Sequence, residues 1–139
     1  MGRYPEIGEV FELEVDFDDP KNMPLGMVGD FGYNSKGWKH NGEVLTGKQK
    51  GQFRLVQKRG SWDEIGKDMN PTNGQWIQGF CQQFPERDSK GRSLGVHADS
   101  WVDPRGDARF PYVFGNGEPY FGWTGSHFDG SWLWLEQVK

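Results

Sequence analysis

Apolar and acidic side chains alternate over residues 9–18, which is the most regular pattern in the chain. Alternation with a period of two is typical of a strand that buries one face and exposes the other. Residues 52–58 repeat the pattern, with Phe53 and Leu55 on one side and mostly basic residues on the other. The sequence therefore predicts a strand at each position. The apolar positions of the first strand are Phe11, Leu13, Val15 and Phe17.

A helical period appears only in the middle of the chain. Pro71 suits the first turn of a helix and Pro85 ends one, so the main helix is predicted over residues 72–84. Ser61 and Glu64 have the spacing of a capping box, which predicts a second, short helix beginning there. Large rings recur at every fourth position of the main helix and share one face. They are Trp76, Phe80 and Phe84.

The pattern of strands returns near the C-terminus. Residues 108–114 and 119–123 flank a Gly-Asn-Gly-Glu turn, which is a strong hairpin signal. Residues 131–138 form the last predicted strand, and a further strand is expected near residues 96–102. We therefore predict an α+β fold: an antiparallel, β-rich single domain with one main helix and a C-terminal β meander.

The length and composition of the chain set limits on this fold. A chain of 139 residues fits one domain spanning residues 1–139. The alternative is three lobes: a β segment over 1–59, a helical connector over 60–92 and a β meander over 93–139. Only 34% of the residues are hydrophobic but 15% are aromatic, so rings must build much of the core.

Two features of the sequence predict a cytoplasmic location and no membrane association. Cys81 is the only cysteine, so no disulfide can form within the chain. The chain begins without the apolar run of a signal peptide, and no stretch approaches the ~18 apolar residues of a membrane span. The oligomeric state is left open by the sequence.

Charge is unevenly distributed along the chain. Residues 1–35 carry eight acidic and two basic residues, whereas residues 36–59 carry seven basic and one acidic residue. The basic segment could bind single-stranded nucleic acid, with a ring stacking on bases and cations neutralising phosphates. The favoured interpretation is that the acidic and basic strands pair with each other. The nucleic-acid candidates are Lys36, Trp38, Lys39, Lys48, Lys50 and Arg54.

Familiar catalytic and metal-binding motifs are missing from the sequence. The three histidines and Cys81 have no metal-ligand spacing, and no glycine-rich phosphate loop occurs. We therefore predict no metal, no cofactor and no catalytic residue, although an enzyme of unrecognised type stays an alternative. The best catalytic candidate for such an enzyme is His97 paired with Asp99 or Asp103.

The aromatic C-terminal segment is the remaining functional signal. In the last strand Leu133 and Leu135 share one face and two tryptophans share the other, so a row of rings is expected at the surface unless both faces are buried. The leading hypothesis is a small non-catalytic binding or accessory protein of prokaryotic or phage type that contacts an unknown protein partner. The protein-binding candidates are Tyr120, Trp123, Trp132 and Trp134.

Overall fold

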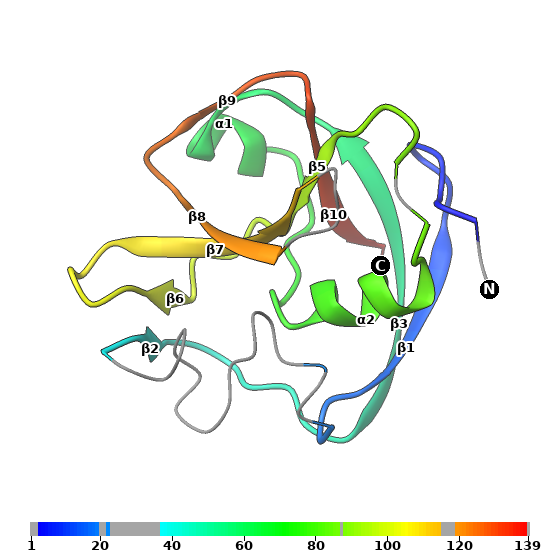
Figure 1. Cartoon of the computed structure of the whole chain (residues 1–139), viewed down its shortest axis with the longest axis horizontal. Helices are drawn as coiled ribbons and strands as arrows, with labels where there is room; N and C mark the ends of the chain where they lie inside the picture. Colours follow the sequence, from blue (N-terminus) through cyan, green and yellow to red (C-terminus); the bar gives the residue numbers. More distant parts are fainter. Residues whose placement is uncertain (1–2, 20–21, 23–36, 87, 115–118, 139) are drawn as a thin grey trace.

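Strand β10 (Trp132–Val138) lies in the middle of the main sheet, between two neighbours that run in different directions. It is antiparallel to β3 (Lys48–Gln57) and parallel to β5 (Ser93–Gly95). The computed structural model describes residues 3–19, 22, 37–86, 88–114 and 119–138, and Figure 1 shows their arrangement.

The main sheet has the order β1-β3-β10-β5-β7-β6-β2, and β8 pairs with β7. A second, two-stranded sheet joins β4 to β9. The sheet is therefore mixed, and the predicted purely antiparallel sheet is wrong at the β5–β10 pair. The remaining strands are β1 (Phe11–Asp16), β2 (Lys39–His40), β4 (Gly60–Ser61), β6 (Trp101–Val102), β7 (Ala108–Val113), β8 (Pro119–Trp123) and β9 (His127–Phe128).

The predicted hairpin is confirmed, but the predicted meander is wrong. Strands β7 and β8 pair antiparallel, with Tyr112 opposite Tyr120. The chain does not continue from β8 to an adjacent strand, because β9 turns away to pair with β4. Strand β10 therefore lies between β3 and β5, and β5 separates it from β7.

The acidic and basic strands of the N-terminal half pair as the favoured interpretation predicts. Strand β1 is antiparallel to β3, with Glu14 opposite Lys50 and Asp16 opposite Lys48. These side chains share one face of the sheet because directly opposite residues in a ladder point the same way. Cross-strand charge pairing therefore helps to set the register of the two strands.

Both helices exist, and the main one is shorter than predicted. Helix α1 (Trp62–Gly66) has the complete capping box of Ser61 and Glu64. Helix α2 (Trp76–Gln83) begins four residues later than the predicted position 72. The side chain of Gln75 exchanges hydrogen bonds with the Leu45 backbone, and its own N–H donates to the Asn73 side chain. These bonds hold the preceding residues in turns. Among the described residues no helix is long and apolar enough to cross a membrane.

Side chains along each strand point alternately to the two faces of the sheet. We call these faces the α2 face and the α1 face, after the helices that cover them. The predicted ring stripe of α2 is buried against the α2 face, as expected. The contact is close, since a Cβ on Gly79 would lie 2.2 Å from Cγ2 of Val15. The core on this face includes Leu13, Val15, Phe53, Leu55, Trp76, Ile77, Phe80, Leu94, Val96, Leu133 and Leu135.

The α1 face carries an aromatic core at its centre. Trp134 is fully enclosed by rings and by α1, which contributes Ile65 and Trp62. Glycines on the neighbouring strands leave room for these rings: a Cβ on Gly95 would lie 2.9 Å from Trp134, and one on Gly122 would lie 2.6 Å from Phe110. Strand β10 is thus buried on both faces, which is the alternative to the predicted exposed row of indoles.

The close packing at Gly79 gives a test of the fold. Replacing an exposed mid-helix glycine with alanine usually stabilises by about 1 kcal/mol. At this site we expect Gly79→Ala to lower the free energy of unfolding by about 1–3 kcal/mol, because the new methyl group meets a rigid, buried valine. Urea unfolding measures the change. In a Val15→Ala background the same substitution should cost less, and a stabilised Gly79→Ala variant would contradict the packing described.

Candidate functional site

Four aromatic side chains continue the aromatic core of the α1 face to the surface. Phe114 and Tyr120 have ring centroids 4.7 Å apart, and Tyr112 and Trp132 have centroids 4.9 Å apart. Tyr112 also contacts Phe114 at 5.2 Å. We call these four residues (Tyr112, Phe114, Tyr120 and Trp132) the aromatic surface.

The register of three strands builds this surface. Tyr112 and Tyr120 are directly opposite in the β7–β8 ladder, so their side chains point to the same face. Trp132 begins β10 and stacks on the buried Trp134, with centroids 5.5 Å apart and planes 20° apart. Phe114 is 40% exposed and Tyr120 is 39% exposed, whereas Tyr112 and Trp132 are half-buried. The rings thus form one layer that is enclosed at one end and open at the other.

The predicted protein-binding residues are separated by the fold. Tyr120 and Trp132 belong to the aromatic surface. Trp134 lies in the core, where Trp62, Phe110 and Phe128 surround it, so it offers a partner no accessible ring. Trp123 is 50% exposed but lies opposite Arg109, and strand alternation places it on the face that Tyr120 does not share.

Sequence reasoning missed Tyr112 and Phe114. The signal was available in part, because residues 108–114 were expected to be a strand of a hairpin. Counting outward from the predicted four-residue turn would have placed Val113 opposite Tyr120, one residue away from the actual pairing of Tyr112 with Tyr120. What the sequence did not show is that β10 enters beside β5, which brings Trp132 next to Tyr112.

Two of the basic residues in the segment form ion pairs with acids from other strands. Lys50 Nζ lies 3.7 Å from Glu14 Oε2, and Arg54 Nε lies 2.6 Å from Oε1 of the buried Glu136. Lys48 is opposite Asp16 in the ladder, Lys39 is exposed in β2, and Lys36 lies outside the described residues. The sixth candidate, Trp38, packs against Phe121 with centroids 5.0 Å apart.

His97 has a structural environment. Its imidazole stacks on Trp62 at a centroid distance of 3.7 Å, and its Nε2 lies 2.7 Å from the Trp62 carbonyl oxygen. Asp103 instead accepts hydrogen bonds from Arg109 Nε and from the backbone N–H groups of Arg105 and Asp107. The candidate pairing of His97 with Asp103 therefore has no support in the geometry.

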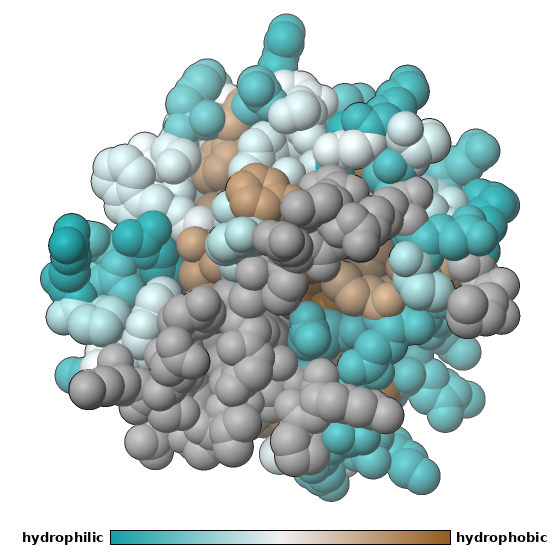
Figure 2. Space-filling model, viewed as in Figure 1, coloured by the Kyte–Doolittle hydropathy of each residue, from teal (hydrophilic) through white to brown (hydrophobic). Residues whose placement is uncertain are grey.

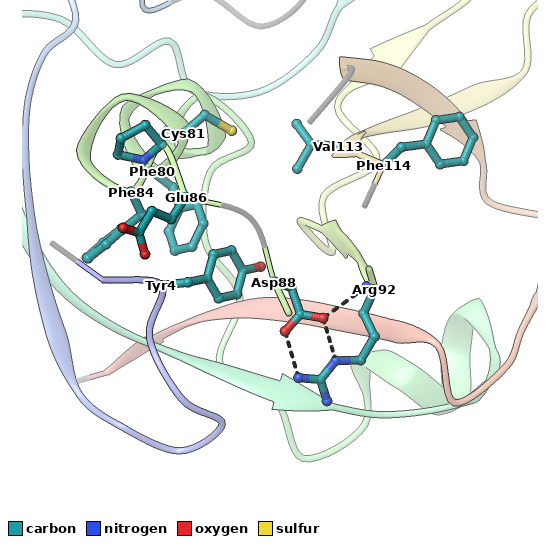
Figure 3. Close-up of a pocket in the computed structure, with 10 residues that line it drawn as sticks. Tyr4, Phe80, Cys81, Phe84, Glu86, Asp88, Arg92, Val113 and Phe114 are labelled. Carbon is teal, nitrogen blue, oxygen red and sulfur yellow. Dashed lines mark hydrogen bonds and ion pairs between the residues drawn. The ribbon is translucent and has the colours of Figure 1, made fainter. Parts of the chain in front are cut away.

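A cavity of about 210 Å³ lies on the α2 face between the end of α2 and the end of β7 (Figure 3). Asp88 and Arg92 form its polar side: Nε and Nη2 of the guanidinium donate to the two carboxylate oxygens at 2.9 and 2.8 Å. The Tyr4 ring points toward this pair in Figure 3. The cavity is lined by Tyr4, Phe80, Cys81, Phe84, Pro85, Glu86, Asp88, Arg92, Val113 and Phe114.

Three titratable groups that line this cavity have shifted pKa values. The Arg92 side chain that donates to Asp88 holds the pKa of this carboxyl below its ordinary value. Burial, together with the nearby Asp88 charge, raises the pKa of Tyr4, and burial raises the pKa of Cys81 to about 11. Cys81 is therefore a protonated thiol at neutral pH, which makes it a poor nucleophile.

In the part of the chain that the structure describes, no three His, Cys, Asp or Glu side chains gather in a way that could hold a metal ion.

The Asp88–Arg92 pair predicts an effect of pH on stability. We expect Asp88→Asn to lower the free energy of unfolding by about 2 kcal/mol at pH 7, because it leaves a largely buried guanidinium without its acceptor. The pKa of Asp88 is lower in the folded state than its ordinary value of about 4. The ionised carboxylate therefore contributes fully to the free energy of unfolding when the pH is well above that ordinary value. This contribution is lost as the pH falls through the pKa of the folded state.

In urea unfolding, the difference in free energy of unfolding between the wild type and Asp88→Asn should therefore be smaller at pH 3 than at pH 7. Asp99→Asn, which changes an exposed carboxylate, is the matched control and should cost little at either pH. An Asp88→Asn deficit that does not vary with pH would contradict the assignment.

Comparisons of the chain with protein-family models, with curated proteins and with solved structures gave no match.

Proposed function

We propose that this protein is a non-catalytic binding protein that contacts a protein partner through the aromatic surface. The observation that carries the proposal is the open end of the ring layer, where Phe114 and Tyr120 touch each other and remain about two-fifths exposed. Aromatic residues are enriched at protein interfaces, because each ring buries a large area and loses little conformational entropy.

The chemistry of the four rings supports a protein partner. Tyr112 and Tyr120 each combine an apolar ring with a hydroxyl, so they can bury area and make a hydrogen bond at the rim of an interface. Trp132 is anchored by its stacking on Trp134, which gives the surface a rigid side. A rigid cluster of this type loses little freedom when it binds, which favours a few strong contacts over many weak ones.

Nucleic-acid binding by residues 36–59 is less well supported. The ion pair of Arg54 with the buried Glu136 of β10 reduces the positive charge available to phosphates. An enzymatic role is less well supported because His97 is fixed by Trp62 and Cys81 is protonated.

The proposal is tested with a Phe114→Ala, Tyr120→Ala double variant. Both rings are about two-fifths exposed, so the variant should keep its far-UV spectrum and lose only part of its stability. We expect it to lose the partner that the wild-type chain retains from extracts of its source organism, and to bind the purified partner more weakly by about 2 kcal/mol or more.

Val10→Ala is the matched control, because Val10 is 51% exposed and lies before β1, away from the aromatic surface. It should retain the partner at wild-type affinity. If the double variant retains the same partner with unchanged affinity, the aromatic surface has no part in binding.

A further inference from the structure

Strand β1 is an edge strand of the main sheet. It stands first in the strand order and forms the right-hand border of the molecule in Figure 1, with no strand outside it. The N–H of Phe17 donates to the carbonyl of Gly47 at 2.8 Å, next to the paired positions Asp16 and Lys48. Since paired backbone groups recur at every second residue of an antiparallel ladder, those of Glu12, Glu14 and Asp16 point away from the sheet.

The two ends of this edge are capped by side-chain amides. Nε2 of Gln83 donates to the carbonyl of Glu12, and Nδ2 of Asn22 donates to the carbonyl of Asp16, both at 2.6 Å. Between these caps, the outward backbone N–H and C=O of Glu14 have no partner among the described residues. An edge strand with such groups is a template on which another strand can pair.

A groove of about 400 Å³ lies beside this edge, between β1 and α2. Gly79 also lines the groove, and the side chain of Val15 packs directly against it. Asn22 is 4% exposed, yet its Oδ1 accepts no hydrogen bond among the described residues. Because this oxygen is buried, the groups that the edge offers to another strand are the outward backbone N–H and C=O of Glu14. The groove is lined by Glu14, Val15, Asp16, Asp19, Asn22, Gly79, Gln82 and Gln83.

Charge defines what this edge can accept. Glu12, Glu14 and Asp16 project from the α1 face at intervals of roughly 7 Å, twice the rise of a strand. On β3 they face Gln52, Lys50 and Lys48, so three acids meet two bases. The Glu14–Lys50 pair is more than 60% exposed on both sides, and such pairs are weak. The border of the molecule along β1 is hydrophilic in Figure 2.

We propose that the β1 edge binds an extended, basic segment of another protein by strand addition. The added strand pairs with the backbone of Glu14, and one of its amides replaces the Gln83 side chain at the carbonyl of Glu12. Lysine or arginine at alternate positions of the added strand faces Glu12, Glu14 and Asp16, as in a cross-strand ion pair. This site is separate from the aromatic surface and does not rest on the proposed function.

The opposing explanation is that the acids only protect the edge from pairing, which is a common role of charges on edge strands. A synthetic decapeptide of alternating lysine and threonine, (Lys-Thr)5, distinguishes the two. We expect its addition to shift the backbone amide resonances of β1 and to slow their hydrogen exchange. The effect should weaken as salt is added, because the pairs are exposed. The charge-reversed peptide (Glu-Thr)5 should have no effect.

Two variants locate the binding. Glu14→Pro removes the outward N–H, which a proline can replace on an edge strand without breaking the ladder to β3, and should lower the affinity for (Lys-Thr)5 about tenfold. The Glu12→Gln, Glu14→Gln double variant keeps every backbone group and removes two charges, so it should also bind severalfold more weakly. Glu43→Gln, which changes an exposed glutamate elsewhere, is the control and should bind like the wild type.

The proposal is overturned if (Lys-Thr)5 leaves β1 unaffected at millimolar concentration, or if (Glu-Thr)5 binds equally well. It is also overturned if the double glutamine variant keeps its wild-type affinity, since that variant retains the edge itself.

Discussion

The insertion of β10 between β3 and β5 is the interaction on which the rest of the structure depends. Leu133, Trp134 and Leu135 are fully enclosed, because α2 and its core cover one face of the strand and the rings around α1 cover the other. The next residue, Glu136, is buried as well and accepts hydrogen bonds from Arg54 and from the N–H of Asn70. A carboxylate in such a position must keep its partners, so it fixes the register of β10 against β3.

The same insertion creates two different surfaces on one face of the sheet. On the β1–β3 side of β10, the α1 face carries a ladder of acids and bases. On the β5–β7–β8 side, it carries rings that begin in the core and end at the aromatic surface. Arg54 and Glu136 stand at the boundary between the two regions. The two proposed contacts therefore use different chemistry. The aromatic surface offers apolar area, whereas the β1 edge offers backbone pairing and charge.

A core built from rings explains why aromatic residues reach the surface. Aliphatic side chains are few, and the described core accordingly includes Trp76, Trp101 and Trp134 together with several phenylalanines. Rings pack well on rings, so the layer extends from Phe110 and Tyr112 of β7 to Phe114, which directly follows this strand. On this face the layer is covered by α1, which is a five-residue helix, and by Phe128 of β9. The layer is longer than its cover, which leaves the last rings open to a partner.

Much of the fold could be predicted from local patterns. The alternation of β1 and β3, the Ser61 capping box, the ring stripe of α2 and the β7–β8 hairpin all depend on neighbours within a few residues or on one turn. The start of α2 was misjudged because Gln75 bonds to the Leu45 backbone, a contact across 30 residues. The candidate site was found in part: Tyr120 and Trp132 were identified, whereas Trp134 was assigned to the surface and Tyr112 and Phe114 were missed.

By itself, then, the sequence determined the longer strands β1, β3, β7, β8 and β10, the existence of both helices, the apolar side of β1 and β3, and that rings must fill the interior. The short strands β2, β4, β5 and β9 were not predicted. The tertiary structure alone decided which strands are neighbours. Each strand has two edges and no local signal names the partner of either, so the parallel contact of β5 with β10 follows from burying Trp134 and Leu135 on both faces at once. That choice of neighbours placed one tryptophan of β10 in the core and left the other at the edge of an open aromatic surface.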